Sequence, residues 1–425
     1  MPELEFYSIV DRSYRWFTPA QNRESIGIDL PNSEYDPDLG QQVLEEVAQG
    51  AQRAERLGFD GLLIFEQHNT PLALFPNALT GAAWLSAKTT GIKIVAGGPI
   101  LNAYSSPVRL AEEIALVDTV SNGRLTVALP LGIGAQYHGY GAMNPVHARA
   151  KFREGVELLH KIWAEDGPFA WEGEHYHHPY VNVWPRQRQD PHPEVFITAA
   201  GSRETIELAA KYDATYQAIL TPMPILTKNT QLFRDLREEY GHKPDRKKIA
   251  AVISIHTAET DEIARAEVEK HALWGLQNVL RFPFNQSFPP GHVSQASLRG
   301  MMSGGYRSSD PSLATWEQIT EGYSYIAGSP ETVIRKLTEL TDAIGAGRVI
   351  CSSDFTLPMW LQEKAQTIFA NDVIPAFRAP DGLAVWQREK PVGYTTATER
   401  AGRKPHYAGT PTVGVNGEYV PLLPQ

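Results

Sequence analysis

Three polar residues follow a run of four apolar residues in the segment LLIFEQHN, which begins at Leu62. The run is typical of a strand buried on both faces, and side chains alternate along a strand. Glu66 and His68 therefore share one side, and Gln67 has the other. A carboxylate beside an imidazole can hold the ring and raise its pKa, which makes a proton donor or acceptor. Glu66 and His68 are candidate catalytic residues; the alternative is that Glu66 satisfies buried backbone or arginine groups and His68 only packs.

A second candidate site is the segment AAGSRETIELAA, residues 199–210. Its pattern predicts the end of a strand, a Gly-Ser turn at Gly201 and Ser202, and the start of a helix. Free N–H groups and the dipole of a helix N-terminus suit a phosphate. Ser202 and Thr205 can add hydroxyl donors, and Arg203 can add a positive charge. The alternative is an ordinary helix with Ser202 as its cap.

Two further segments carry unusual residues at the end of predicted strands. VAGGPIL (95–101) contains Gly98 and Pro99, and proline inside a strand indicates a bulge or a special peptide bond. LGIGAQYHGYGAM (131–143) contains Tyr137 and His138, which are candidate catalytic residues or packing aromatics.

Other charged and metal-binding side chains have simpler interpretations. We expect Arg109 to pair with Glu112 or Glu113 on a helix surface, and Arg124 to cap or pair at a helix-to-strand corner. The histidines of EHYHHP are His175, His177 and His178, and no nearby Asp or Cys completes a metal-binding set. We predict no metal site.

The composition excludes several classes of protein. A net charge of −10 argues against a protein that binds a phosphate backbone. No apolar stretch reaches the roughly 18 residues of a membrane span, and we see no signal peptide. Cys351 is the only cysteine, so no intrachain disulfide can form. We expect a soluble cytoplasmic protein without nucleic-acid or membrane partners.

These segments need a scaffold in which the ends of many strands meet. Eight apolar runs alternate with helical patterns, which indicates a parallel sheet. The count of eight favours a closed (β/α)8 barrel, a TIM barrel, over an open doubly wound sheet. The predicted strands cover residues 4–10, 62–65, 94–101, 125–132, 195–200, 216–220, 250–255 and 349–353. The predicted helices cover about 43–58, 106–117, 147–164, 202–212, 225–240, 261–278, 330–344 and 361–377.

Three segments depart from the alternation. We predict a hairpin near 165–192, a lid-like loop near 280–322 that carries Phe282, Phe284, Phe288 and Tyr306, and a C-terminal extension over 379–425. The predicted domain division is therefore a barrel over 1–378 followed by this extension.

Over roughly residues 40–280 and 325–378 the chain resembles the bacterial luciferase-like monooxygenases. The resemblance rests on AERLGFDGLLIFEQH (54–68), SPVRLAEEIALVDTVSNGRL (106–125), GSRETIELAAKYDATYQ (201–217) and GSPETVIRKL with FANDVIPAFR, within 328–378. It implies a (β/α)8 barrel, a homodimer and a flavin at the carboxyl ends of the strands.

The resemblance also implies roles for single residues. Ser202 and Thr205 match the residues that hold the flavin phosphate, with Gly201 and Arg203 beside them. The Gly98–Pro99 bond matches a cis peptide under the flavin ring. Gln67 stands where the family has a catalytic histidine, so that role does not transfer directly, and His68 matches the following histidine. Leu131 replaces a phosphate-binding arginine, which leaves that charge to Arg203 or to the inserted loop.

We therefore predict a flavin-dependent monooxygenase of the two-component type. It would use O2 and reduced FMN from a separate flavin reductase to oxygenate a small organic substrate. One alternative is a deazaflavin-dependent oxidoreductase of the same fold. The other is a non-catalytic flavin-binding protein.

Overall fold

The computed structural model describes most of the 425-residue chain. The described residues are 2–14, 30–132, 136, 144–199, 201–219, 223–279, 289–292, 314–354, 357–379 and 382–388. Tyr137, His138, most of the predicted lid and the last 37 residues of the C-terminal extension lie outside them.

Eight parallel strands close into a barrel, because β8 pairs with β9 and so joins the two halves of the sheet. In ring order the strands are β1 (Glu5–Ile9), β2 (Gly61–Phe65), β3 (Lys93–Gly97), β4 (Leu125–Pro130), β7 (Glu194–Ala199), β8 (Thr215–Ala218), β9 (Ile249–Thr257) and β11 (Arg348–Ser352). The predicted (β/α)8 barrel is confirmed, and each barrel strand overlaps a predicted one.

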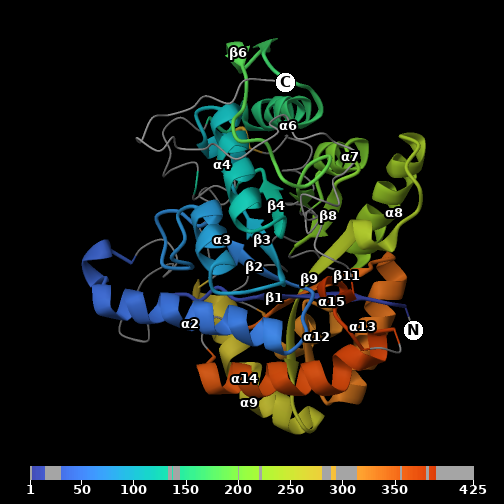
Figure 1. The fold of residues 1–425 in the computed structure, drawn as a ribbon. Coiled ribbons are helices and arrows are strands. Elements are labelled where there is room, and N and C mark those ends of the chain that lie inside the picture. The colour runs from blue at the N-terminus through green and yellow to red at the C-terminus, as the bar shows by residue number, and fades with distance from the viewer. Residues whose placement is uncertain are drawn as a thin grey trace, which may run out of the picture.

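Helices surround the strands (Figure 1). They are α2 (Pro37–Arg56), α3 (Ala78–Ser86), α4 (Pro107–Val120), α6 (Ala148–Ala164), α7 (Arg203–Lys211), α8 (Met223–Glu239), α9 (Asp261–Trp274), α12 (Trp316–Glu321), α13 (Pro330–Ile344), α14 (Met359–Ile368) and α15 (Val385–Arg388). Local signals set several starts; the Ser106 hydroxyl, for example, caps α4 just before Pro107. The sequence analysis missed α3, α12 and α15.

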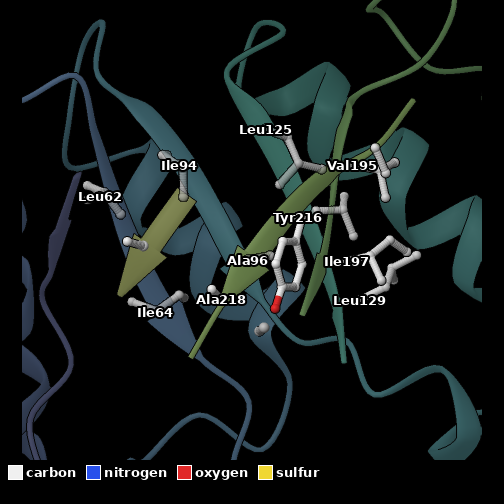
Figure 2. Close-up of a cluster of buried hydrophobic side chains, with 14 of the residues drawn as sticks. Leu62, Ile64, Ile94, Ala96, Leu125, Leu129, Val195, Ile197, Tyr216 and Ala218 are labelled. Carbon is white, nitrogen blue, oxygen red and sulfur yellow. The ribbon is translucent and has the colours of Figure 1, made fainter. Parts of the chain in front are cut away.

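The two faces of each barrel strand have different roles. Tyr7, Leu63, Val95, Phe196 and Ile350 belong to a small cluster that fills the barrel interior. Residues of the opposite parity belong to the large core under the helices, and Figure 2 shows members of this set from β2, β3, β4, β7 and β8. This alternation decides which polar residues at the strand ends face the interior.

The predicted hairpin is confirmed, and the structure also describes parts of the predicted lid segment and of the C-terminal extension. β5 (Phe169–Glu172) and β6 (His177–Val181) form an antiparallel hairpin, as predicted for 165–192. The described end of the predicted lid segment holds α12, a helix where a loop was predicted. β10 (Tyr325–Gly328), an unpredicted strand just after that segment, extends the sheet beside β9. Near the start of the C-terminal extension, the Trp386 indole donates to the carbonyl of Phe59 at 2.8 Å, which fixes α15 on the barrel.

The amino-terminal end of the barrel is filled by an ion-pair network. Arg348 lies between Glu5 and Glu194, with N–O distances of 2.8 and 2.5 Å. Lys247 reaches the other oxygen of Glu5 at 2.8 Å, and Arg348 also donates to the hydroxyl of Thr215. Buried charges that are fully paired in this way suit a structural role.

Candidate functional site

The carboxyl ends of the strands form the barrel mouth, where active sites of this fold lie. Beyond the last apolar layer, the residues at inward-facing positions are polar. They include Asp11 after β1, Gln67 after β2, and Asp354 after β11. Two neighbours on β7 and β8, Thr198 and Gln217, face the same interior and share a hydrogen bond of 2.9 Å. The mouth therefore presents hydrogen-bonding groups above an apolar interior.

Glu66 and His68 contact each other at the edge of this mouth. Nε2 of His68 lies 3.0 Å from Oε1 of Glu66, and both residues are buried. Glu66 also accepts hydrogen bonds from the backbone N–H groups of Ala78 and Ile100, each at 3.1 Å. The carboxylate thus orients the imidazole, as the catalytic hypothesis requires, and also satisfies backbone groups, as the alternative states. Both interpretations describe part of its role.

The alternation of side chains along β2 determines which way Glu66, Gln67 and His68 face. Leu62 and Ile64 face the helices, and Glu66 continues that side, where it binds the first residue of α3. Gln67 takes the inward parity of Leu63. His68 therefore stands at the rim of the mouth and not in its centre.

Gly98 and Pro99 lie next to Glu66. The bond between them is cis, as predicted. Gly98 has a φ of +124°, and a Cβ atom there would come within 2.4 Å of Cβ of Glu66. Only glycine fits both the backbone conformation and this close approach. The end of β3 is thus held against Glu66 at the carboxyl end of β2.

The predicted phosphate site lies at the start of α7, at the carboxyl end of β7. Ser202 is the N-cap residue, yet its hydroxyl makes no capping bond. Instead, Nη1 of Arg149 on α6 lies 2.7 Å from that hydroxyl oxygen. The helix N–H groups, the hydroxyl and the guanidinium together make a site suited to a phosphate. Ser202 is therefore not an ordinary N-cap residue, because its hydroxyl does not bind the first turn of the helix.

Arg149 was missed by sequence reasoning. With Leu131 and Thr205 it lines a groove of about 260 Å³ between α6 and α7. Leu131 stands where the resembled family has an arginine, so Arg149 brings a guanidinium to the same groove from another element. Arg203, which was predicted to supply this charge, is exposed and is not part of the groove lining.

A second donor lies behind the same turn. Gly201 has a φ of +136°, and a Cβ atom there would lie 2.9 Å from the amide nitrogen of Asn229 on α8. That nitrogen is buried, with the Tyr216 hydroxyl as a neighbour to which it can donate.

The remaining predictions for charged residues have structural outcomes. Arg109 pairs with Glu113 at 2.7 Å, as expected. Arg124 binds backbone carbonyls, including that of Ser121 at 2.8 Å, and so caps its corner as predicted. His178 contacts the hydroxyl of Ser106 at 3.4 Å. Within the described part of the chain, no group of three or more His, Cys, Asp or Glu residues is placed to hold a metal.

Two inward-facing carboxyl groups were also missed. Asp11 and Asp354 line one small cavity in the wall of the mouth. Burial raises the pKa of Asp11 to about 8, and the N–H of Phe65 offsets part of that rise. Burial likewise raises the pKa of Asp354 to about 7 against the hydrogen bond from the Tyr325 hydroxyl. The signal was present in YSIVD and VICSSD, where a polar residue follows an apolar strand just as in LLIFE.

The chain was compared with known proteins. The family model described as luciferase-like monooxygenase matches residues 16–346. Limonene 1,2-monooxygenase of Rhodococcus erythropolis is 25% identical over 68% of this chain and 71% of its own length. Among the described helices, none is long and apolar enough to span a membrane.

Two solved structures share the fold. The oxygenating constituent of 3,6-diketocamphane monooxygenase of Pseudomonas putida, in complex with FMN, matches with a TM-score of 0.63 and 21% identity over 89% of this chain and 100% of that chain. The coenzyme F420-dependent tetrahydromethanopterin reductase of Methanopyrus kandleri matches with a TM-score of 0.62 and 18% identity over the same shares. Because the family match extends over residues 16–346, most of the sequence, this chain belongs to the luciferase-like monooxygenases and is an enzyme of that family.

Proposed function

We propose that this protein is the oxygenase component of a two-component flavin monooxygenase. It would bind reduced FMN from a separate reductase and use O2 to oxygenate a small organic substrate. One observation carries the proposal: the Arg149 guanidinium lies on the Ser202 hydroxyl at the N-terminus of α7, where the hydroxyl makes no capping bond. The similarity to a limonene monooxygenase and to an FMN-bound oxygenating constituent supports this choice.

The residues present fit a flavin. Gly201, Ser202 and Thr205 would hold the phosphate, with Arg149 supplying the charge that the sequence analysis assigned to Arg203. Gly98 and Pro99 would support the ring. When bound, the reduced flavin supplies the electrons that activate oxygen. The protein supplies orientation, hydrogen bonds and exclusion of water.

We propose His68 as the catalytic residue at the rim, with Glu66 as the positioning residue that holds its ring. Tyr137 and His138 stay candidates for the same pocket; both lie outside the described residues. We also propose a homodimer and a cytoplasmic location.

A second function is favoured by the structural match to a reductase that depends on F420, a deazaflavin. Both cofactors place a phosphate at the end of the ribityl chain, so the α7 site suits either. The oxygen reaction separates them: purified protein is mixed with each reduced cofactor and oxygen uptake is followed. Rapid uptake with reduced FMN supports the monooxygenase. Hydride transfer from reduced F420 without oxygen uptake supports the alternative, and tight flavin binding without any turnover indicates a non-catalytic protein.

The phosphate site has its own test. Ser202→Ala combined with Thr205→Ala, and separately Arg149→Met, should weaken FMN binding by roughly 10-fold or more, since hydrogen bonds to charged groups contribute about 1.5–3 kcal/mol. Riboflavin, which lacks the phosphate, should bind as before. Arg203→Met is the matched control, because Arg203 lies on the same turn but outside the groove. Equal losses for FMN and riboflavin would contradict the assignment.

A further inference from the structure

Asp11 and Asp354 lie side by side in the wall of the barrel mouth, although 343 positions separate them in the sequence. β1 and β11 are parallel neighbours with Ser8 opposite Cys351. Extended by three residues beyond that last pair, the register would set Asp11 opposite Asp354, and both residues line one cavity. Both residues also occupy inward-facing positions, because each lies an even number of residues after an inward-facing isoleucine, Ile9 on β1 and Ile350 on β11. The two carboxyl groups therefore belong to one place at the carboxyl end of the barrel.

The two carboxyl groups share a cavity of about 10 Å³, which is close to the room one water molecule needs. Oδ2 of Asp11 accepts from the N–H of Phe65. Oδ1 of Asp11 is buried and has no hydrogen-bond partner among the described residues. Asp354 accepts from the hydroxyl of Tyr325 on β10. One carboxyl oxygen is thus left to act on whatever occupies the cavity.

The charged groups around this cavity do not neutralise the pair. Arg12 lines the same cavity, but its Nε pairs with Glu46 of α2 at 3.2 Å and its Nη2 donates to the carbonyl of Leu357. Gln362 of α14 and Ser353 complete the polar lining. Among the described residues, no basic side chain makes an ion pair with Asp11 or Asp354. Burial without a paired cation favours the protonated form of each carboxyl group.

We propose that Asp11 and Asp354 form a proton-holding pair that relays one proton to the reacting oxygen during turnover, a role that rests on the proposed monooxygenase function. Monooxygenation converts reduced flavin, O2 and substrate into oxidised flavin, oxygenated product and water. An O–H bond of the pair breaks as an O–H bond forms on the oxygen atom that leaves as water. The carboxylate then regains the proton that the reduced cofactor loses on oxidation. The pair ends as it began, so no further reactant is needed.

A role as proton donors explains why the two carboxyl groups are buried without a paired cation. A proton donor works best when its pKa lies near the working pH. The raised pKa values of about 8 and about 7 meet that condition, whereas an ordinary aspartate, near 3.9, would be ionised.

The first test uses flavin-free protein and the variants Asp11→Asn and Asp354→Asn. Infrared spectra of the carboxyl stretch are recorded from about pH 4 to pH 10. The wild-type protein should show a carboxylic acid that ionises near neutral pH, and each variant should alter that transition. Asp372→Asn, at an exposed position, is the matched control and should leave it unchanged. Ionisation of both groups near pH 4 overturns the proposal, whether or not the protein binds FMN.

The second test follows flavin reoxidation after protein loaded with reduced FMN is mixed with oxygenated buffer, at several pH values. Without an organic substrate the products are oxidised flavin and hydrogen peroxide, and the relay delivers its proton to the departing peroxide oxygen. Both variants should slow this step by about 10-fold or more and flatten its dependence on pH, with FMN affinity unchanged. Since Asn still accepts the N–H of Phe65, a purely structural role would change thermal stability and leave the pH profile intact. That result overturns the proposal.

Discussion

Glu5 and Glu194 at the amino-terminal end of the barrel contrast with Asp11 and Asp354 at the mouth. Glu5 and Glu194 take inward-facing positions on their strands, and Asp11 and Asp354 take the equivalent positions just beyond theirs. At the amino-terminal end Arg348 bridges the two glutamates and Lys247 adds a further ion pair. At the mouth, no described basic side chain pairs with the aspartates. The difference shows that the barrel stabilises its charges at one end and leaves them uncompensated at the end where ligands bind.

The pKa values follow the same division. Burial alone would raise the pKa of Glu5, but Arg348, Lys93 and Lys247 outweigh it and hold that pKa well below the usual range. For Asp11 burial prevails and the pKa rises to about 8. In the folded protein Asp11 stays protonated at pH values where the unfolded chain would lose that proton. Asp11 therefore lowers the free energy of unfolding as the pH rises from about 3.9, the ordinary pKa of an aspartate, toward 8. Glu5 does the reverse, and its contribution is lost when the pH falls below about 4.

The largest effect is expected for Arg348→Met. Removing the cation leaves Glu5 and Glu194 buried without a partner, and breaking a buried ion pair costs about 3–5 kcal/mol. The free energy of unfolding, measured with urea at neutral pH, should fall by that amount. The loss should shrink toward about pH 4, where both glutamates can be protonated.

The exposed Arg335–Glu339 pair provides the control for this variant. Arg335→Met should cost no more than about 0.5 kcal/mol, as for other exposed helix pairs. A similar small loss for Arg348→Met would show that the network at the amino-terminal end does not stabilise the barrel.

The next effect has the opposite sign. Asp11→Asn removes a group that must stay protonated in the folded state, so the variant should be more stable than wild type at pH 7, by about 1–4 kcal/mol. The gain should vanish below about pH 4, where Asp11 is protonated in both states. Thermal unfolding at several pH values measures it. Equal melting temperatures for the two proteins across this pH range would mean that the buried charge of Asp11 is neutralised as fully as those of Glu5 and Glu194.

The smallest expected effect concerns the rim. His68→Ala should lower turnover at least 10-fold, about 1.4 kcal/mol of barrier, with flavin affinity little changed. Glu66→Gln tests the positioning role, because Gln carries no charge beside the imidazole and keeps one oxygen, which can accept from either Ala78 or Ile100. This second variant should shift the pH profile of turnover. Normal turnover with reduced thermal stability in His68→Ala would make His68 a packing residue.

Local patterns were sufficient for the regular elements. The strands are apolar runs and most helices are amphipathic, so each could be recognised within a few turns of chain. α3 was missed because ALTGAAWLS is almost uniformly apolar and has no polar face to reveal its period. The pairing of Arg109 with Glu113 and the constraint at Gly98–Pro99 likewise depend on neighbouring residues.

The site depended on contacts between distant parts of the chain. The sequence by itself determined that polar groups end the strands and that a helix begins after a Gly-Ser turn at Ser202. Only the tertiary structure decided that Arg149 reaches Ser202, that Glu66 faces the helices, and that Asp11 and Asp354 meet in one cavity. The physical reason is that barrel closure and strand parity set these neighbours. Closure brings β11 beside β1, and no local pattern specifies which charges then remain without a partner.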